Sequence, residues 1–230
     1  MNKYSSQHRA AEQARAAATV SVPSSASNSL IKNTYMLLSM TLFFSGAVAW
    51  FAANAHARPL GFLPTIILMF GLLFLLNAVR NSVWALPVVF LFTGFFGYTL
   101  GPVIGYYLQT PGGTNVLVTA LMGTGVTFGA LSIYALTTRK NFNFLSGFLF
   151  AGIIVVLLAA LANFFLKMPV LYLVISAVSV LLACGFILFD TSRIVNGGET
   201  NYVMATVSLY LDIYMLFVNL LSLLSAFNRN

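Results

Sequence analysis

The sequence predicts an all-α membrane protein in which seven transmembrane helices form one bundle. The first observation behind this prediction is composition. Of the 230 residues, 60% are hydrophobic and only 7% are charged, whereas an ordinary soluble domain is about 25% charged. The second is that the chain contains seven apolar runs, each close to the roughly 20 residues that a helix needs to cross a bilayer. Helices are the expected state of these runs because lipid offers no hydrogen-bond partners to the unpaired backbone groups at an open sheet edge.

Short polar connections separate the seven predicted spans. Charged residues, Asn, Pro or Gly stand at most of the ends, and the segment Gln109–Gly113 is the clearest stop signal. The seventh span is the weakest because it contains Asp212, and a six-span alternative would lose it. The predicted spans are Leu30–Ala53, Leu60–Val79, Val83–Leu108, Val116–Leu136, Phe144–Leu166, Val170–Phe189 and Tyr202–Phe227.

Residues 1–29 are predicted to form a disordered cytoplasmic tail, and residues 30–230 the transmembrane domain. The tail is polar, rich in Ala and Ser, and contains Lys3, Arg9 and Arg15. It lacks the apolar core of a signal peptide, and its low hydrophobicity is typical of segments that do not fold alone.

The distribution of basic residues predicts the orientation. With the N-terminus inside the cell, the cytoplasmic side carries eight Lys and Arg residues and the opposite side three. Cytoplasmic loops of membrane proteins are enriched in these residues, so we expect a cytoplasmic N-terminus and a periplasmic C-terminus. The eight are Lys3, Arg9, Arg15, Lys32, Arg80, Arg139, Lys140 and Arg193, and the three are Arg58, Lys167 and Arg229.

Several kinds of function are disfavoured by what the chain lacks. Its formal charge of +7 is scattered over segment ends rather than gathered in a basic patch, so no nucleic-acid partner is expected. One Cys and two distant His cannot build a metal site, and no cofactor is expected. A rhomboid-type protease needs a membrane-embedded His, but His8 and His56 lie in the tail and in a loop. We therefore expect no enzymatic activity.

The two aspartates are the candidate functional residues. Asp190 ends the sixth predicted span and Asp212 lies within the seventh. A carboxylate at the bilayer centre costs about 2.5–3.5 kcal/mol even on a lenient scale, so such a residue faces the bundle interior or pairs. If the two carboxyl groups meet, they cannot both ionise easily and the pair shares a proton, which makes it pH-responsive. The alternative is an interfacial Asp190 and a separately satisfied Asp212. Intramembrane aspartyl proteases typically carry a glycine directly before the catalytic aspartate. Neither Asp190 nor Asp212 follows a glycine, so this class of protease is disfavoured.

Glycines at four-residue spacing mark faces of close helix packing. They are Gly97, Gly101 and Gly105 in the third span and Gly125 and Gly129 in the fourth. Small residues at this spacing let helix backbones approach each other in a membrane. The faces serve either packing within one bundle or association into a homo-oligomer, and the sequence leaves both open.

Several segments resemble the Bax inhibitor-1 (TMBIM) family, in particular its bacterial YccA branch. The resemblance covers nearly all of the chain after residue 30, and the most specific part is the Gly-Gly-Glu-Thr-Asn-Tyr loop. The segments that carry it are 33–39, 92–102, 134–140, 187–195, 197–202 and 205–214.

The resemblance implies a seven-helix bundle with a central last helix. It implies that Asp190 and Asp212 form a pH-sensitive latch on a calcium leak path, with calcium as the transported ion. Arg80 matches an arginine that partners one aspartate in some members. The YccA branch also contains inner-membrane substrates and inhibitors of the membrane protease FtsH, which grips their N-terminal tail. FtsH modulation is therefore the leading expectation, and a pH-gated calcium leak is the alternative.

Overall fold

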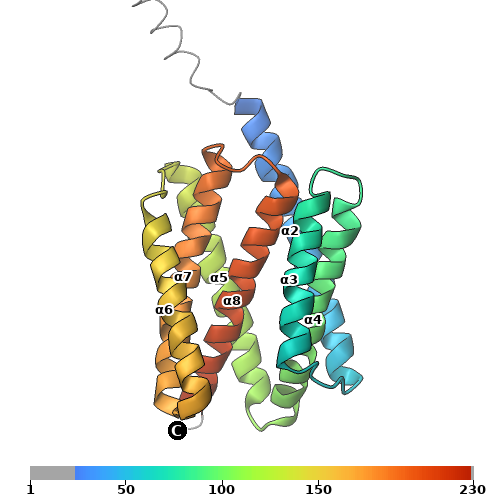
Figure 1. Cartoon of the computed structure of the whole chain (residues 1–230), viewed down its shortest axis with the longest axis vertical. Helices are drawn as coiled ribbons and strands as arrows, with labels where there is room; N and C mark the ends of the chain where they lie inside the picture. The colour runs from blue at the N-terminus through green and yellow to red at the C-terminus, as the bar shows by residue number, and fades with distance from the viewer. Residues whose placement is uncertain (1–23, 229–230) are drawn as a thin grey trace, which may run out of the picture.

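The computed structural model describes residues 24–228. Within that range the chain forms seven helices and no strand, and each helix is long and apolar enough to cross a membrane (Figure 1). The predicted fold class is confirmed. The expected tail lies outside the described residues over positions 1–23, and so does Arg229. The helices are α2 (Ser24–Asn54), α3 (Phe62–Val79), α4 (Ala85–Gln109), α5 (Gly113–Thr138), α6 (Leu145–Leu166), α7 (Pro169–Val195) and α8 (Tyr202–Phe227).

Helices α2 and α7 show the largest extensions beyond the ranges that hydropathy predicts. Helix α2 begins at Ser24 rather than at Leu30, and α7 continues to Val195 rather than ending at Phe189. The extension of α7 matters for function because Asp190 now lies five residues before the helix end. At 1.5 Å per residue this is about 7.5 Å inside the helix rather than at its terminus.

Helix α8 occupies the centre of the bundle. It packs against α7, α5, α2 and α4, and Figure 1 shows it between α2, α3 and α4 on one side and α6 and α7 on the other. The burial of its side chains reflects this position, because they are buried around most of the helix circumference and not along one stripe. The buried residues are Val203, Ala205, Thr206, Val207, Leu209, Tyr210, Asp212, Ile213, Leu216, Phe217 and Leu221.

Helices α2 and α4 form the closest helix pair. A Cβ atom added at Gly97 would collide with the backbone carbonyl of Ser45, and one added at Gly101 would collide with the side chain of Ala52. These two glycines therefore serve packing inside the bundle. At Gly125 and Gly129 a Cβ would meet nothing within 4 Å, so the second glycine pair makes no such approach within the described residues.

Hydrogen bonds from Tyr210 join three helices in the interior. The Tyr210 hydroxyl lies 2.6 Å from Ser45 Oγ on α2 and donates to the carbonyl of Thr93 on α4 at 3.3 Å. Tyr210 is only 2% exposed. A buried tyrosine usually finds a partner for its hydroxyl, and here the partners fix the position of α8.

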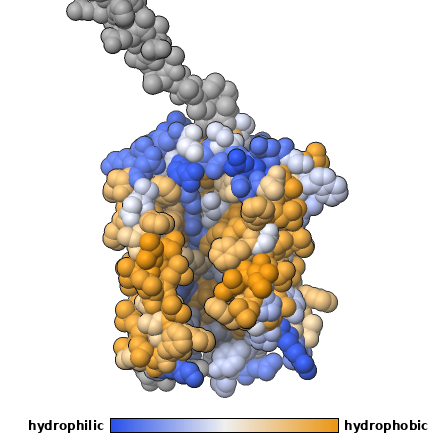
Figure 2. Space-filling model, viewed as in Figure 1, coloured by the Kyte–Doolittle hydropathy of each residue, from blue (hydrophilic) through white to orange (hydrophobic). Residues whose placement is uncertain are grey.

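The outer surface of the bundle is apolar over its middle. Figure 2 shows hydrophobic residues in a broad band with hydrophilic residues at both ends. All seven described helices contribute exposed large side chains to the apolar surface, including Phe43, Phe74, Leu91, Val126, Phe164, Leu181 and Phe227. A monomeric soluble protein rarely exposes so continuous an apolar surface, so this band is the surface that faces lipid.

Candidate functional site

The carboxyl groups of Asp190 and Asp212 are close enough for the charge of one to affect the ionisation of the other. Asp212 is 7% exposed, and the side chain of Asp190 is 12% exposed. Two carboxyl groups this close cannot both ionise without strong repulsion, whereas a single shared proton allows a hydrogen bond between them. The pair is therefore a buried site that can hold or release a proton.

The lengths of α7 and α8 bring the two aspartates to the same depth. Asp212 lies ten residues after the first residue of α8, about 15 Å along the helix. Asp190 would lie far from it if α7 ended at Phe189, as the hydropathy pattern suggests. Because α7 continues to Val195 and leans against α8, Asp190 is carried into the interior.

A basic residue and a third carboxylate extend the pair toward the end of the bundle. Arg193 Nη1 lies 3.6 Å from Asp190 Oδ1, and Arg193 Nη2 lies 3.7 Å from Glu199 Oε2. The Arg193 guanidinium also lies 5.6 Å from the centre of the Phe189 ring. The guanidinium thus bridges a buried carboxylate and a more accessible one, which partly offsets the charge of Asp190 when it is ionised.

The loop between α7 and α8 is folded so that Glu199 reaches Arg193. Gly197 has φ of 76°, a left-handed conformation that glycine adopts without strain. The amide of Gly198 then donates to the Arg193 carbonyl at 2.8 Å. Glu199 Oε1 accepts from the amides of Thr200 and Asn201, both at 2.9 Å. These contacts explain why a Gly-Gly-Glu sequence follows the end of α7.

Asn201 completes the loop by capping α8. Its Oδ1 accepts from the amides of Val203 at 2.9 Å and Met204 at 3.1 Å, which satisfies two donors at the start of the helix. Its Nδ2 donates to the carbonyl of Arg80 at 2.8 Å and to Asn81 Oδ1 at 3.0 Å. The loop is therefore also tied to the end of α3.

The structure brings Asp190 and Asp212 together but does not bring Arg80 to them. The Arg80 side chain is exposed, and within the described residues it makes no ion pair; its carbonyl, rather than its guanidinium, contacts the α7–α8 loop. The cation beside the aspartates is Arg193. The expected latch contact of Arg80 is thus not formed in this arrangement.

Arg193 and Glu199 are the residues that the sequence reasoning missed. In the sequence, Arg193 counts only among the basic residues that predict orientation. Glu199 stands only in the Gly-Gly-Glu-Thr-Asn-Tyr loop that supports the family resemblance. The spacing could have identified Arg193, because residues three apart on a helix are neighbours and Asp190 with Arg193 is an oppositely charged pair at this spacing. No comparable local signal exists for Glu199, since its contact depends on the fold of the loop.

Buried hydroxyl groups accompany the pair in the interior. The oxygen atoms that have no hydrogen-bond partner among the described residues come from four helices, α2, α5, α7 and α8. Such groups are normally satisfied, often by internal water, so a hydrated interior is the expected state around them. The atoms are Thr34 Oγ1, the Tyr35 hydroxyl, Ser132 Oγ, Thr191 Oγ1 and Asp212 Oδ2.

The described part of the chain shows no group of three His, Cys, Asp or Glu side chains placed to hold a metal ion. The site is instead a pair of neighbouring carboxyl groups inside an apolar bundle. Together with seven spanning helices, these features define a multi-pass α-helical membrane protein with two carboxyl groups in its interior.

The chain belongs to the Bax inhibitor-1 family. The family model described as "Inhibitor of apoptosis-promoting Bax1" matches residues 27–229. The chain is similar to the Escherichia coli K12 protein named "Modulator of FtsH protease YccA", with 47% identity over 201 residues that cover 87% of this chain and 91% of the relative. An equally similar protein from another Escherichia coli strain is named "Inner membrane protein YccA". A Vibrio cholerae protein described as a membrane protein is 46% identical over 204 residues, covering 88% of this chain and 92% of that one.

Proposed function

We propose that this protein is a non-enzymatic modulator, both substrate and inhibitor, of an FtsH-type protease in the bacterial inner membrane. One observation carries the proposal: 47% identity, over nearly the full length of both chains, to a relative that is named a modulator of this protease. The inner-membrane location is supported by a relative named "Inner membrane protein YccA". The chain acts by occupying the protease and not by catalysing a reaction.

The segment that the protease grips is proposed to be the N-terminal tail. Helix α2 begins at Ser24, so up to 23 residues precede it, and a fully extended segment of that length spans about 75–80 Å. Helix α2 begins at the end of the bundle that carries Arg80, Arg139, Lys140 and Arg193. That end is cytoplasmic in the proposed orientation, where an ATP-driven protease has access to it.

The first test removes the tail. Deletion of residues 2–22 leaves α2 intact, and we expect the protein to remain in the membrane with a several-fold longer half-life in cells that contain FtsH. A matched variant in which residues 2–22 are scrambled keeps the length and composition, and we expect it to be degraded at the normal rate. Pulse-chase measurements compare the three proteins. An unchanged half-life after deletion would show that the tail is not the handle.

A second candidate function, a pH-sensitive calcium leak, is supported by the buried pair. Asp190 and Asp212 are neighbours in the interior, and buried oxygen atoms without hydrogen-bond partners among the described residues, Asp212 Oδ2 among them, favour internal water. Release of the shared proton would add a charge in a poorly solvated place and bias the bundle toward another arrangement. The pair is the proposed sensor.

The second test measures calcium flux into liposomes between about pH 5 and pH 8. Asp190→Asn or Asp212→Asn leaves a pair that hydrogen-bonds in the same way throughout this range, so we expect a flat pH profile in either variant. Glu12→Gln makes the same chemical change in the tail and should leave the profile unaltered. If calcium flux has the same pH profile in the wild type and in both Asn variants, the aspartate pair is not the pH sensor. That result would not affect the proposed role toward the protease.

A further inference from the structure

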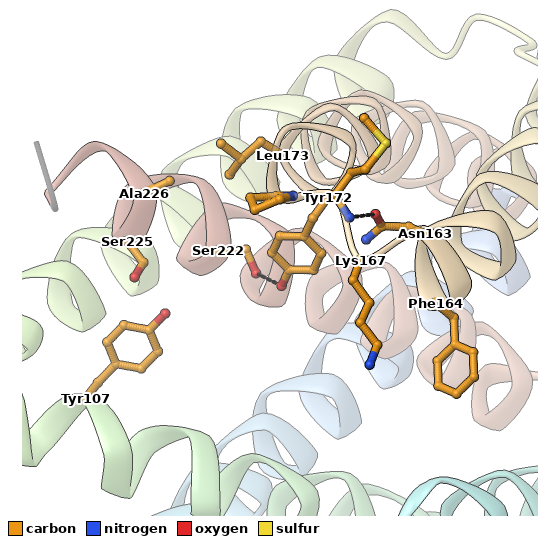
Figure 3. Close-up of a pocket in the computed structure, with 11 residues that line it drawn as sticks. Tyr107, Asn163, Phe164, Lys167, Tyr172, Leu173, Ser222, Ser225 and Ala226 are labelled. Carbon is orange, nitrogen blue, oxygen red and sulfur yellow. Dashed lines mark hydrogen bonds between the residues drawn. The ribbon is translucent and has the colours of Figure 1, made fainter.

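A hollow of about 780 Å³ opens at the end of the bundle opposite the aspartate pair. Helices α4, α6 and α8 end around it and α7 begins there, and Figure 3 shows its lining. It lies at the level of the span ends, where a bilayer has its headgroups. Its polar lining consists of Tyr107, Asn163, Lys167, Tyr172, Ser222 and Ser225.

The backbone at the end of α6 holds Lys167 at the edge of the hollow. Lys167 has φ of 51°, and its amide donates to the Asn163 carbonyl at 2.8 Å. Asn163 Oδ1 in turn accepts from the amide of Met168 at 3.0 Å. These bonds close the last turn of α6 around the left-handed residue. Figure 3 shows the Lys167 side chain extending into the space between Tyr107 and Phe164.

Among the described residues, the Lys167 ammonium has no carboxylate partner. The four acidic residues of the chain are Glu12, Asp190, Glu199 and Asp212, and the last three belong to the site at the far end of α7 and the first half of α8. Among the described residues, Lys167 forms no ion pair; the two salt bridges both involve Arg193. A positive charge in a hollow without acidic neighbours favours an anionic ligand.

Two hydroxyl groups elsewhere in the lining of the hollow can donate to such a ligand. Tyr107 and Ser225 line the hollow, and their hydroxyl groups make no hydrogen bond within the described part of the chain. The hydroxyl of Tyr172 is used differently. It lies 2.9 Å from Ser222 Oγ, which itself donates to the Val218 carbonyl at 2.9 Å, so this contact braces α7 against α8 and shapes the wall.

The remaining wall is apolar and faces the membrane. Phe164 is 69% exposed and Met168 is 49% exposed, and Leu173 continues the apolar lining along α7. A ligand that fits both parts must be amphipathic, with an anionic group at the level of Lys167 and hydrocarbon beside Phe164 and Leu173.

We propose that this hollow binds a membrane phospholipid. Lys167 pairs with the phosphate, the hydroxyl groups of Tyr107 and Ser225 donate to its oxygen atoms, and an acyl chain lies along Phe164 and Leu173. The lipid comes from the leaflet at the C-terminal end of the bundle. Its binding is separate from the aspartate pair and from the tail.

The test titrates the full-length protein in detergent with phosphatidylglycerol and measures bound lipid by native mass spectrometry. Lys167→Gln keeps most of the side-chain length but removes the charge, and we expect about tenfold weaker binding, equivalent to about 1.4 kcal/mol. Lys167→Arg should bind as the wild type does. Arg58→Gln removes an exposed cation at the same end of the bundle but outside the hollow, and its affinity should stay within about twofold of the wild type.

Two further probes separate the sources of binding. Diacylglycerol with the same acyl chains lacks the phosphate and should bind weakly, and free glycerol phosphate should not compete. If Lys167→Gln and Arg58→Gln weaken binding equally, the interaction is non-specific and the proposal is wrong. It is also wrong if diacylglycerol binds as tightly as phosphatidylglycerol, or if free glycerol phosphate displaces the lipid. Should Lys167→Gln fail to fold, the double variant Tyr107→Phe with Ser225→Ala tests the same site, with weaker binding expected and unchanged binding contradicting the proposal.

Discussion

Asp212 is the residue at which burial and charge conflict most directly. It is 7% exposed, and its Oδ2 atom has no hydrogen-bond partner among the described residues. An ionised carboxylate in this position would have lost most of its water without full compensation. In the proposed function, a proton shared with the neighbouring carboxyl of Asp190 would resolve the conflict, and its release would then affect the packing of α7 against α8.

Tyr210 provides a test of interior hydrogen bonding. Tyr210→Phe removes the bond to Ser45 and leaves the Ser45 hydroxyl buried, so we expect unfolding in detergent to require about 1–2 kcal/mol less free energy. Tyr214→Phe is the matched control. Tyr214 is partly buried and lies 3.2 Å from Thr99 Oγ1, which also donates to the Phe96 carbonyl. Tyr214→Phe should lower the unfolding free energy by under about 0.5 kcal/mol. Equal losses in both variants would contradict the stabilising role of the Tyr210 hydrogen bonds.

The sequence could predict both aspartates but not their surroundings. Acidic residues are rare in spans, so Asp190 and Asp212 stand out by composition alone. The contact of Glu199 with Arg193 depends on a left-handed Gly197 and on the course of the loop, which hydropathy does not report. The family resemblance implies a contact between Arg80 and one aspartate, and Arg80 does follow α3 at the same end of the bundle. Level within the membrane does not determine which way a side chain points around the helix.

At the scale of elements, helix existence was predictable and helix ends were not. The polar residues after Phe189 reduce hydropathy and suggest that the span stops there. The structure shows why α7 continues. Ser192 Oγ donates to the Lys140 carbonyl at 2.9 Å and accepts from the amide of Phe142 at 3.1 Å, while Arg193 pairs with Asp190. These polar groups are satisfied by other parts of the chain, so the helix can retain them.

The glycine faces differ in what they contact, which yields a second prediction. Gly101→Ala places a methyl group against Ala52 on α2, and we expect a loss of about 1–3 kcal/mol in unfolding free energy from overpacking. Gly125→Ala adds the same group where nothing lies within 4 Å. It should be neutral or stabilise slightly, because alanine favours a helix more than glycine does.

Unfolding of the two glycine variants in detergent, followed by circular dichroism, measures the difference. If Gly125→Ala lowers the unfolding free energy as much as Gly101→Ala does, the conclusion that the α4 face packs closely and the α5 face does not would be wrong. If Gly125→Ala changes oligomeric state but not monomer stability, the α5 face instead serves association between copies.

At the scale of the whole molecule, charge asymmetry predicts orientation. In the described residues, Lys32, Arg80, Arg139, Lys140 and Arg193 lie toward one end of the bundle, and Arg58 and Lys167 at the other. We expect a reporter fused after Asn230 to be periplasmic and one fused before Met1 to be cytoplasmic. Paired alkaline phosphatase and fluorescent-protein fusions measure both ends. A cytoplasmic C-terminal reporter would contradict the proposed orientation.

The lateral order of the helices was the least predictable feature. Helices α3 and α6 are apolar around their whole circumference, so no stripe in their sequence marks an inner face. In the structure α3 packs mainly against α4, and α6 mainly against α7. Their places at the edges of the bundle follow from the packing of the other helices. The resemblance to a known family suggested the central α8, which hydropathy alone does not distinguish from its neighbours.

The central position of α8 has a consequence for biogenesis. Of the seven described helices it is the last to be synthesised, because it follows α2 to α7 in the chain. Until it enters the bilayer, Asp190 lacks Asp212 and Ser45 lacks Tyr210. Chains are made from the N-terminus at about 5–20 residues per second. Helices α2 to α7 are therefore synthesised before α8 is available to pack against them. A ribosome that stalls after α7 therefore releases helices that span the membrane but cannot assemble around a centre.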